Sequence, residues 1–185
     1  MGLNIRNIVP RKEIELSDLK GKLVCVDAYN MLYQFLSTIR QPDGTPLKDN
    51  KGRVTSHLSG IFYRNANLIS DGISLIYVFD GKPPDLKAIT HKNRGEIREL
   101  AREKYISAQD SEDIDGMKKY SSQLIRLDRE MISESKELLE AMGIAVVQAP
   151  GEGEMQCAEL VKSGEAFAVG SQDYDAIAVG GKRLI

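Results

Sequence analysis

Short apolar runs alternate with stretches of helical periodicity along this 185-residue chain, and this alternation strongly limits the folds open to it. The clearest strand is the unbroken run Ser74–Phe79, and Lys22–Val26, Ala145–Gln148 and Ala166–Gly170 are also expected to be strands. Arg183–Ile185 is expected to begin a fifth. Strands that alternate with helices usually form a parallel sheet covered by those helices. The pattern therefore predicts an α/β fold.

The segments between these runs have helical character. Ala28–Arg40 is expected to be a helix that follows the first strand, and Gly143 is a natural end for the helix before Ala145–Gln148. A further helix is expected after Thr55, with an apolar stripe toward the core. The stripe consists of Leu58, Ile61, Phe62, Leu68 and Ile69.

The composition changes between Gly81 and about Glu130, where apolar residues are sparse and charges dense. We interpret this stretch, about residues 82–130, as two exposed helices inserted at the edge of the sheet. Basic residues outnumber acidic ones in its first half: Lys87, Lys92, Arg94, Arg98, Arg102 and Lys104 against Glu96, Glu99 and Glu103. A solvated helix pair with ion pairs between successive turns would have the same composition.

The bulk composition is that of one globular domain, with 42% hydrophobic and 28% charged residues. Cys25 and Cys157 have no CxxC partner, which favours a reducing compartment over disulfides or structural zinc. The sequence shows neither a membrane-spanning run nor a signal segment, so no membrane association and a cytoplasmic location are expected. The net charge of −2 does not exclude a nucleic-acid partner, because two bound divalent cations would reverse its sign.

Carboxylates follow each of the four predicted strands, at the edge where open parallel sheets bind ligands. They are Asp27, Asp80, Glu152, Glu154, Asp173 and Asp175. Carboxylates crowded together repel one another by several kcal/mol unless cations join them. Oxygen ligands without nearby His or Cys select Mg²⁺ or Mn²⁺ over zinc. Two such ions roughly 3.5–4 Å apart can stabilise the attacking and leaving oxygens of a phosphoryl displacement.

Each acid also has an ordinary structural explanation. Asp27 and Asp173 are suited to cap helices, Asp80 to a turn with Gly81, and Glu152 and Glu154 to a first helical turn. Taken together, these explanations do not account for an acid after every strand. The sequence contains no phosphate-binding GxxxxGK[ST] loop, GxSxG elbow or GxGxxG fingerprint. Its two histidines are far apart in the sequence, and His57 is expected to be structural.

These residues lie within motifs that resemble those of the flap endonucleases, the structure-specific 5′ nucleases of DNA replication and repair, and most closely the archaeal members. The resemblance runs from Met1 to the end of the chain. Its motifs include Ile8–Ile14, Asp27–Asn30, Tyr33–Leu36, Asp43–Leu47, Ser56–Gly60, Val78–Pro84, Met142–Ile144, Ala149–Glu154 and Ser171–Asp175.

The resemblance implies a PIN-like fold made from two nuclease regions, residues 1–98 and 116–185, with the insertion as a helical arch for a single-stranded 5′ flap. The six acids would hold two Mg²⁺ ions, with Mn²⁺ as a substitute. Lys87 and Arg94 would contact the scissile phosphate. The implied activity is cleavage of 5′ flaps on branched DNA, with 5′–3′ exonuclease activity on nicked or gapped duplex. Further DNA contacts are implied for Gly2, Tyr33, Arg40 and Arg64, with Tyr33 stacked on a base.

The family pattern continues beyond this chain with a further Asp ligand, a duplex-gripping segment and a C-terminal motif that binds a sliding clamp. We therefore expect the chain to be the N-terminal part of such a nuclease, and the sliding clamp to be a partner of the whole protein. Two alternatives remain open. One is another 5′ nuclease branch of the superfamily, and the other is a weakly active or non-catalytic DNA-binding fragment.

Overall fold

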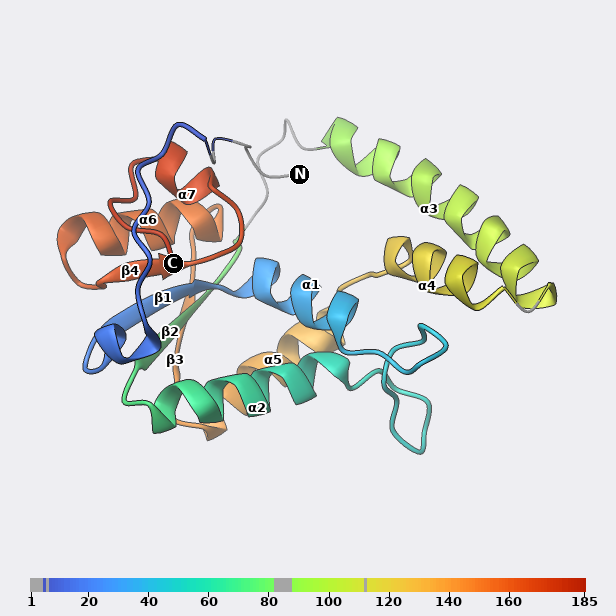
Figure 1. Ribbon diagram of the computed structural model, residues 1–185, viewed down its shortest axis with the longest axis horizontal. Coiled ribbons are helices and arrows are strands. Elements are labelled where there is room, and N and C mark those ends of the chain that lie inside the picture. The colour runs from blue at the N-terminus through green and yellow to red at the C-terminus, as the bar shows by residue number, and fades with distance from the viewer. Residues whose placement is uncertain (1–4, 6, 82–87, 112) are drawn as a thin grey trace.

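The computed structural model describes residues 5, 7–81, 88–111 and 113–185, which form a sheet, its covering helices and a projecting helix pair (Figure 1). The strands are β1 (Leu23–Asp27), β2 (Ser74–Phe79), β3 (Ala145–Gln148) and β4 (Ala168–Gly170). The helices are the 3-10 turn η1 (Leu16–Leu19), α1 (Ala28–Thr38), α2 (Ser56–Ser70), α3 (Ala88–Asp110), α4 (Ile114–Gln123), α5 (Arg129–Ala141), α6 (Gly153–Ser163) and α7 (Asp175–Ala178).

The four strands are parallel and lie in the order β3-β2-β1-β4. Asp27 is the register partner of Val78, and Phe79 is the partner of Gln148. The last residues of β1, β2 and β3 therefore lie at one edge of the sheet. This arrangement confirms the predicted α/β class with a parallel sheet.

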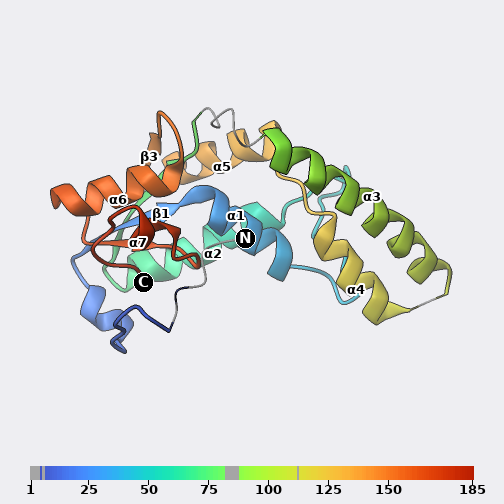
Figure 2. The same cartoon turned by 90° about the horizontal axis from the view of Figure 1, so that it is seen from above.

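Helices cover both faces of the sheet (Figures 1 and 2). Helices α1, α2 and α5 lie on one face, and α6 and α7 lie on the other. Residues of β1 alternate between the two cores, with Val24 and Val26 on the α1 side and Cys25 on the α6 side, next to Cys157. Both thiols are buried and free. Because both faces are packed, the strands cannot shift register without exposing one core.

The pair α3 and α4 projects away from the sheet (Figures 1 and 2). Its two helices pack on each other, and Ala101 and Ala108 of α3 are buried there. Asp113 caps α4 by accepting a hydrogen bond from the Gly116 backbone N–H at 3.0 Å. The predicted insertion is therefore a packed helix pair. None of the helices in the described part of the chain is long and apolar enough to span a membrane.

The structure corrects three local expectations. Phe62 and Ile69 are 48% and 43% exposed, so the buried stripe of α2 is narrower than predicted. Buried Asn65 takes part of the inner face, where its Oδ1 accepts a hydrogen bond from the Tyr77 hydroxyl at 2.9 Å. Arg183–Ile185 does pair with β4 in parallel, through the Leu184–Val169 bridge and its backbone hydrogen bonds, but it is too short to be a full strand. The region predicted as the strand Ala166–Gly170 is extended only from Ala168.

Gly60 sets the close approach of α2 to α1. A Cβ at this position would overlap the Phe35 ring, which is itself buried against Gly60. We predict that Gly60→Ala lowers the free energy of unfolding by about 1–2 kcal/mol, because overpacking outweighs the gain in helix propensity. Urea denaturation measures this free energy, and we expect the dependence of the free energy on urea concentration to be unchanged by the substitution. Asn67→Ala, at an exposed position of the same helix, should be neutral or slightly stabilising, and an equal loss in both variants would contradict the packing argument.

Candidate metal centre

The first carboxylate of the site is the last residue of β1. Asp27 is only 4% exposed, and it is also the N-cap of α1, where its Oδ1 accepts a hydrogen bond from the Asn30 backbone N–H at 3.1 Å. The capping role considered from the sequence is therefore real. It leaves the other carboxylate oxygen outside the cap, so capping and ligation are compatible.

Asp80 is bound to the turn between β3 and α6. Its Oδ1 accepts a hydrogen bond from the Gly153 backbone N–H at 2.7 Å, and the Gly81 N–H donates to the Gly151 carbonyl at 2.6 Å. A Cβ on Gly81 would collide with the Ala149 carbonyl oxygen. Glycine is therefore required where the end of β2 crosses the turn that carries Glu152 and Glu154.

Asn30 connects the remaining acids to α1. Its Nδ2 donates to Asp173 Oδ2 at 2.9 Å, and its Oδ1 accepts from the Gln172 backbone N–H at 3.3 Å. Asp175 begins the short helix α7. Sequence reasoning assigned Asn30 no role, although it lies in the Asp27–Asn30 motif. The sequence feature that could have identified Asn30 is its position three residues after Asp27, the expected N-cap of the same helix.

The pKa values of two acids show that the group interacts electrostatically. Burial, together with the charges of Asp27, Asp175, Asp173 and Glu152, raises the pKa of Glu154 to about 7. Burial likewise raises the pKa of Asp27 to about 6, with contributions from Asp80 and Asp173, against the lowering effect of the Asn30 backbone hydrogen bond. Each of the other four acids thus acts electrostatically on Glu154 or on Asp27.

The donor set suits a hard cation, although the acids do not converge on a single point. Within the described residues, no three His, Cys, Asp or Glu side chains form a group that could hold a metal ion directly. Mg²⁺ keeps several water ligands and is commonly held by one or two carboxylates, so a tight cage is not required. Carboxylates that are buried, as Asp27 is, or partly buried, as the others are, with no thiolate or imidazole among them, fit Mg²⁺ or Mn²⁺ on chemical grounds.

The other predicted site residues have different surroundings. Tyr33 is 44% exposed on α1 and available for stacking. Arg40 donates hydrogen bonds to the Leu36 carbonyl, the Gly44 carbonyl and the Ser121 hydroxyl, at 2.9, 2.6 and 2.8 Å, so much of its guanidinium is engaged inside the protein. Gly2 and Lys87 lie outside the described residues. The backbone of Arg94 lies in α3, but its side chain is outside the described part.

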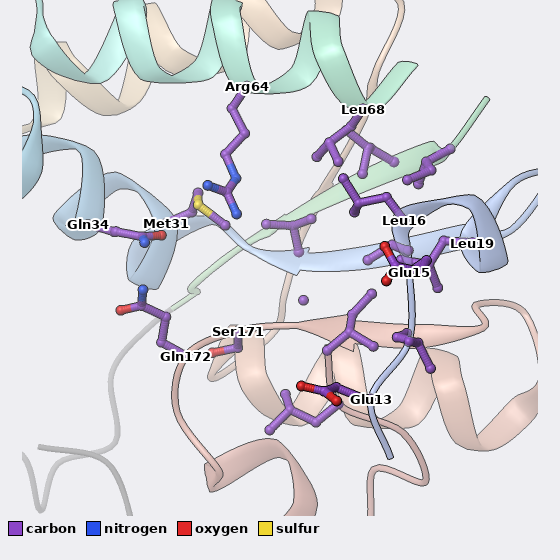
Figure 3. Close-up of a pocket in the computed structure, with 18 of the residues that line it drawn as sticks. Glu13, Glu15, Leu16, Leu19, Met31, Gln34, Arg64, Leu68, Ser171 and Gln172 are labelled. Atoms are coloured by element: carbon purple, nitrogen blue, oxygen red, sulfur yellow. The ribbon is translucent and has the colours of Figure 1, made fainter. Parts of the chain in front are cut away.

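Arg64 lines a cavity of about 570 Å³ that runs under the N-terminal segment beside the site (Figure 3). One end of the cavity is apolar, with Leu19 and Leu68. The other end is polar, where the Arg64 guanidinium and the amides of Gln34 and Gln172 gather. The residue after Gln172 is the predicted ligand Asp173, so this polar end adjoins the carboxylate edge.

A parallel sheet with acids along its carboxyl edge and a projecting helix pair defines a PIN-like α/β domain. The family model of the XPG N-terminal domain matches residues 4–101, more than half of the chain. The model of the XPG I-region matches residues 143–185, which carry Glu152, Glu154, Asp173 and Asp175. The chain therefore belongs to the XPG family.

Known proteins confirm the predicted resemblance. Flap endonuclease 1 of Aeropyrum pernix is 50% identical over 188 residues, which include all of this chain and 54% of that protein. The structure of flap endonuclease-1 from Methanococcus jannaschii is 43% identical, with a TM-score of 0.75 over 99% of this chain and 58% of that one. The catalytic core of Rad2 in complex with DNA substrate is 30% identical, with a TM-score of 0.65 over 94% and 44%. The chain spans about half the length of the curated relatives it matches.

The raised pKa values predict how stability depends on pH. The folded protein holds protons on Asp27 and Glu154 more tightly than an unfolded chain does, so without divalent cations the free energy of unfolding should fall as pH rises from about 4 to about 7. Glu154→Gln should make this fall shallower, whereas Glu159→Gln, at an exposed position of α6, should not. Thermal unfolding across this pH range measures it, and identical slopes in all three proteins would contradict the electrostatic grouping.

Proposed function

We propose that this chain carries the metal centre of a structure-specific 5′ nuclease that cleaves flaps in DNA and degrades nicked or gapped duplex from the 5′ end. The observation that carries the proposal is the group of six acids at one edge of an XPG-family sheet, where burial and the charges of neighbouring acids together raise the pKa of Glu154 to about 7. Such a group is costly to fold, and divalent cations at that edge would offset the cost.

In this proposal Asp27, Asp80 and Glu154 hold the ions, together with the flanking acids Glu152, Asp173 and Asp175. When bound, two divalent cations stabilise the attacking and leaving oxygens of a phosphodiester. The protein contributes fixed geometry, since backbone N–H groups and Asn30 hold the acids in place. Preorganised ligands need not rearrange when charge develops during the reaction.

DNA is the substrate we infer. The Rad2 core was solved with a DNA substrate, and this chain has the same fold at 30% identity. Tyr33 presents an exposed ring on α1, and Arg64 lies near the site, so both are suited to contact an unpaired strand. We propose that α3 and α4 form the arch through which a 5′ flap passes. The choice of Mg²⁺, the sliding-clamp partner and the cytoplasmic location also stay predictions.

Another branch of the same superfamily is the second candidate. The fold is shared with human GEN1 bound to Holliday junction DNA, at a TM-score of 0.59 but only 23% identity. Cleavage of flap, bubble and Holliday junction substrates by the same preparation separates the candidates. We expect the flap to be cut fastest, because the sequence is most similar to flap endonucleases.

Asp173 is the acid that tests catalysis by this chain. We predict that Asp173→Asn lowers the Mg²⁺-dependent rate of flap cleavage by about 100-fold or more, because each lost ligand weakens stabilisation worth several kcal/mol. Asp71→Asn, at the exposed end of α2, should cleave at the wild-type rate. If both wild type and Asp173→Asn cleave the flap, and at equal rates, the proposed centre is excluded. Cleavage by neither protein would favour the alternative of a DNA-binding fragment.

A further inference from the structure

We propose that Gln148 is a positioning residue for Asp80, and that Lys136 holds Gln148 in the orientation this requires. Gln148 is the last residue of β3 and the register partner of Phe79. Its Nε2 donates to the backbone carbonyls of Phe79 and Asp80, at 3.2 and 2.5 Å. One side chain thus holds the backbone at the point where β2 ends and the predicted metal ligand begins.

Lys136 of α5 fixes which way the Gln148 amide faces. Its ammonium donates to Gln148 Oε1 at 2.7 Å, and it lies 4.9 Å from the centroid of the Phe79 ring. An ammonium can only donate, so the oxygen of the amide must face Lys136. The amide nitrogen is then turned toward the two carbonyls, which can only accept. The pairing of donors and acceptors therefore excludes the flipped amide.

The other restraints on this chain segment come from the backbone. The Gly153 and Gly81 N–H groups bind the Asp80 carboxylate and the Gly151 carbonyl, and the Ala149 N–H donates to the Phe79 carbonyl at 2.8 Å. Among the hydrogen bonds described at the end of β2, the Gln148 amide is the side-chain donor to these carbonyls. We call Gln148 and Lys136, together with the Phe79 and Asp80 carbonyls that Gln148 binds, the clamp. The Gln148 amide is the part of the clamp that a substitution can remove.

A clamp and a simple charge effect predict opposite results. Gln148→Glu keeps the acceptor for Lys136 but turns a carboxylate oxygen toward two carbonyls. Lys136→Met removes the group that orients the amide. Both changes make the surroundings of the acids more negative, so electrostatic attraction alone would tighten cation binding. If Gln148 positions Asp80, both changes weaken cation binding instead.

The inference rests on the proposed function, because it requires a cation at Asp80. The experiment is titration of the chain with Mn²⁺, followed by electron paramagnetic resonance of the free ion, at a temperature where every variant is folded. We expect Gln148→Glu and Lys136→Met each to weaken binding by about 10-fold, as substitutions behind metal ligands commonly do. Lys136→Arg, which can still donate to Gln148 and cover the Phe79 ring, should restore most of the affinity. Lys162→Met, on the exposed end of α6, is the matched control.

Asp80→Asn separates the two ways in which the experiment can fail. If wild type binds Mn²⁺ no better than Asp80→Asn, the proposed metal centre itself is wrong. If wild type does bind in an Asp80-dependent way, but Gln148→Glu and Lys136→Met bind equally or more tightly, the positioning role is overturned. A double variant no weaker than either single variant would support a single clamp made by both residues.

Discussion

Repulsion among the carboxylates at the sheet edge is the constraint on which the rest of this structure depends. Two anions roughly 4 Å apart repel by about 4 kcal/mol at an effective dielectric of 20. At this edge, burial and the charges of four neighbouring acids together raise the pKa of Glu154 to about 7. Nothing in the acids themselves favours such an arrangement. It persists because the parallel register fixes where β1, β2 and β3 end, and because cores on both faces prevent the strands from slipping.

Hydrogen bonds from backbone N–H groups and from one side chain then determine how three of the acids are held. Asp27 uses one oxygen as a helix cap, Asp80 accepts from Gly153, and Asp173 accepts from the Asn30 side chain. These donors stabilise the charged forms and partly oppose the effects of burial and repulsion. The site thereby keeps its geometry, while burial and the charges of neighbouring acids lower the stability of the fold when Asp27 and Glu154 are ionised.

The sequence was most informative where one physical signal acts alone. Unbroken apolar runs such as Ser74–Phe79 identify buried strands, and parallel topology then brings the following acids to one edge. The stripe of α2 was less certain, because helical periodicity does not reveal that Asn65 can be buried by bonding Tyr77. The hydrogen-bond partners of Arg40 also could not be predicted from the sequence. A basic residue near the predicted site suggests DNA, whereas its bonds to Gly44 and Ser121 depend on how distant segments meet.

Those bonds give α1 a place in both parts of the proposed mechanism. At its N-terminal end, Asp27 and Asn30 belong to the carboxylate edge. Just beyond its C-terminal end, Arg40 donates to the carbonyl of Leu36 and reaches across to Ser121 in α4. Helix α1 packs on α2 along its length and on β1 and β2. It therefore connects the carboxylate edge at one end with the projecting helix pair at the other, where the Arg40–Ser121 hydrogen bond joins it to α4.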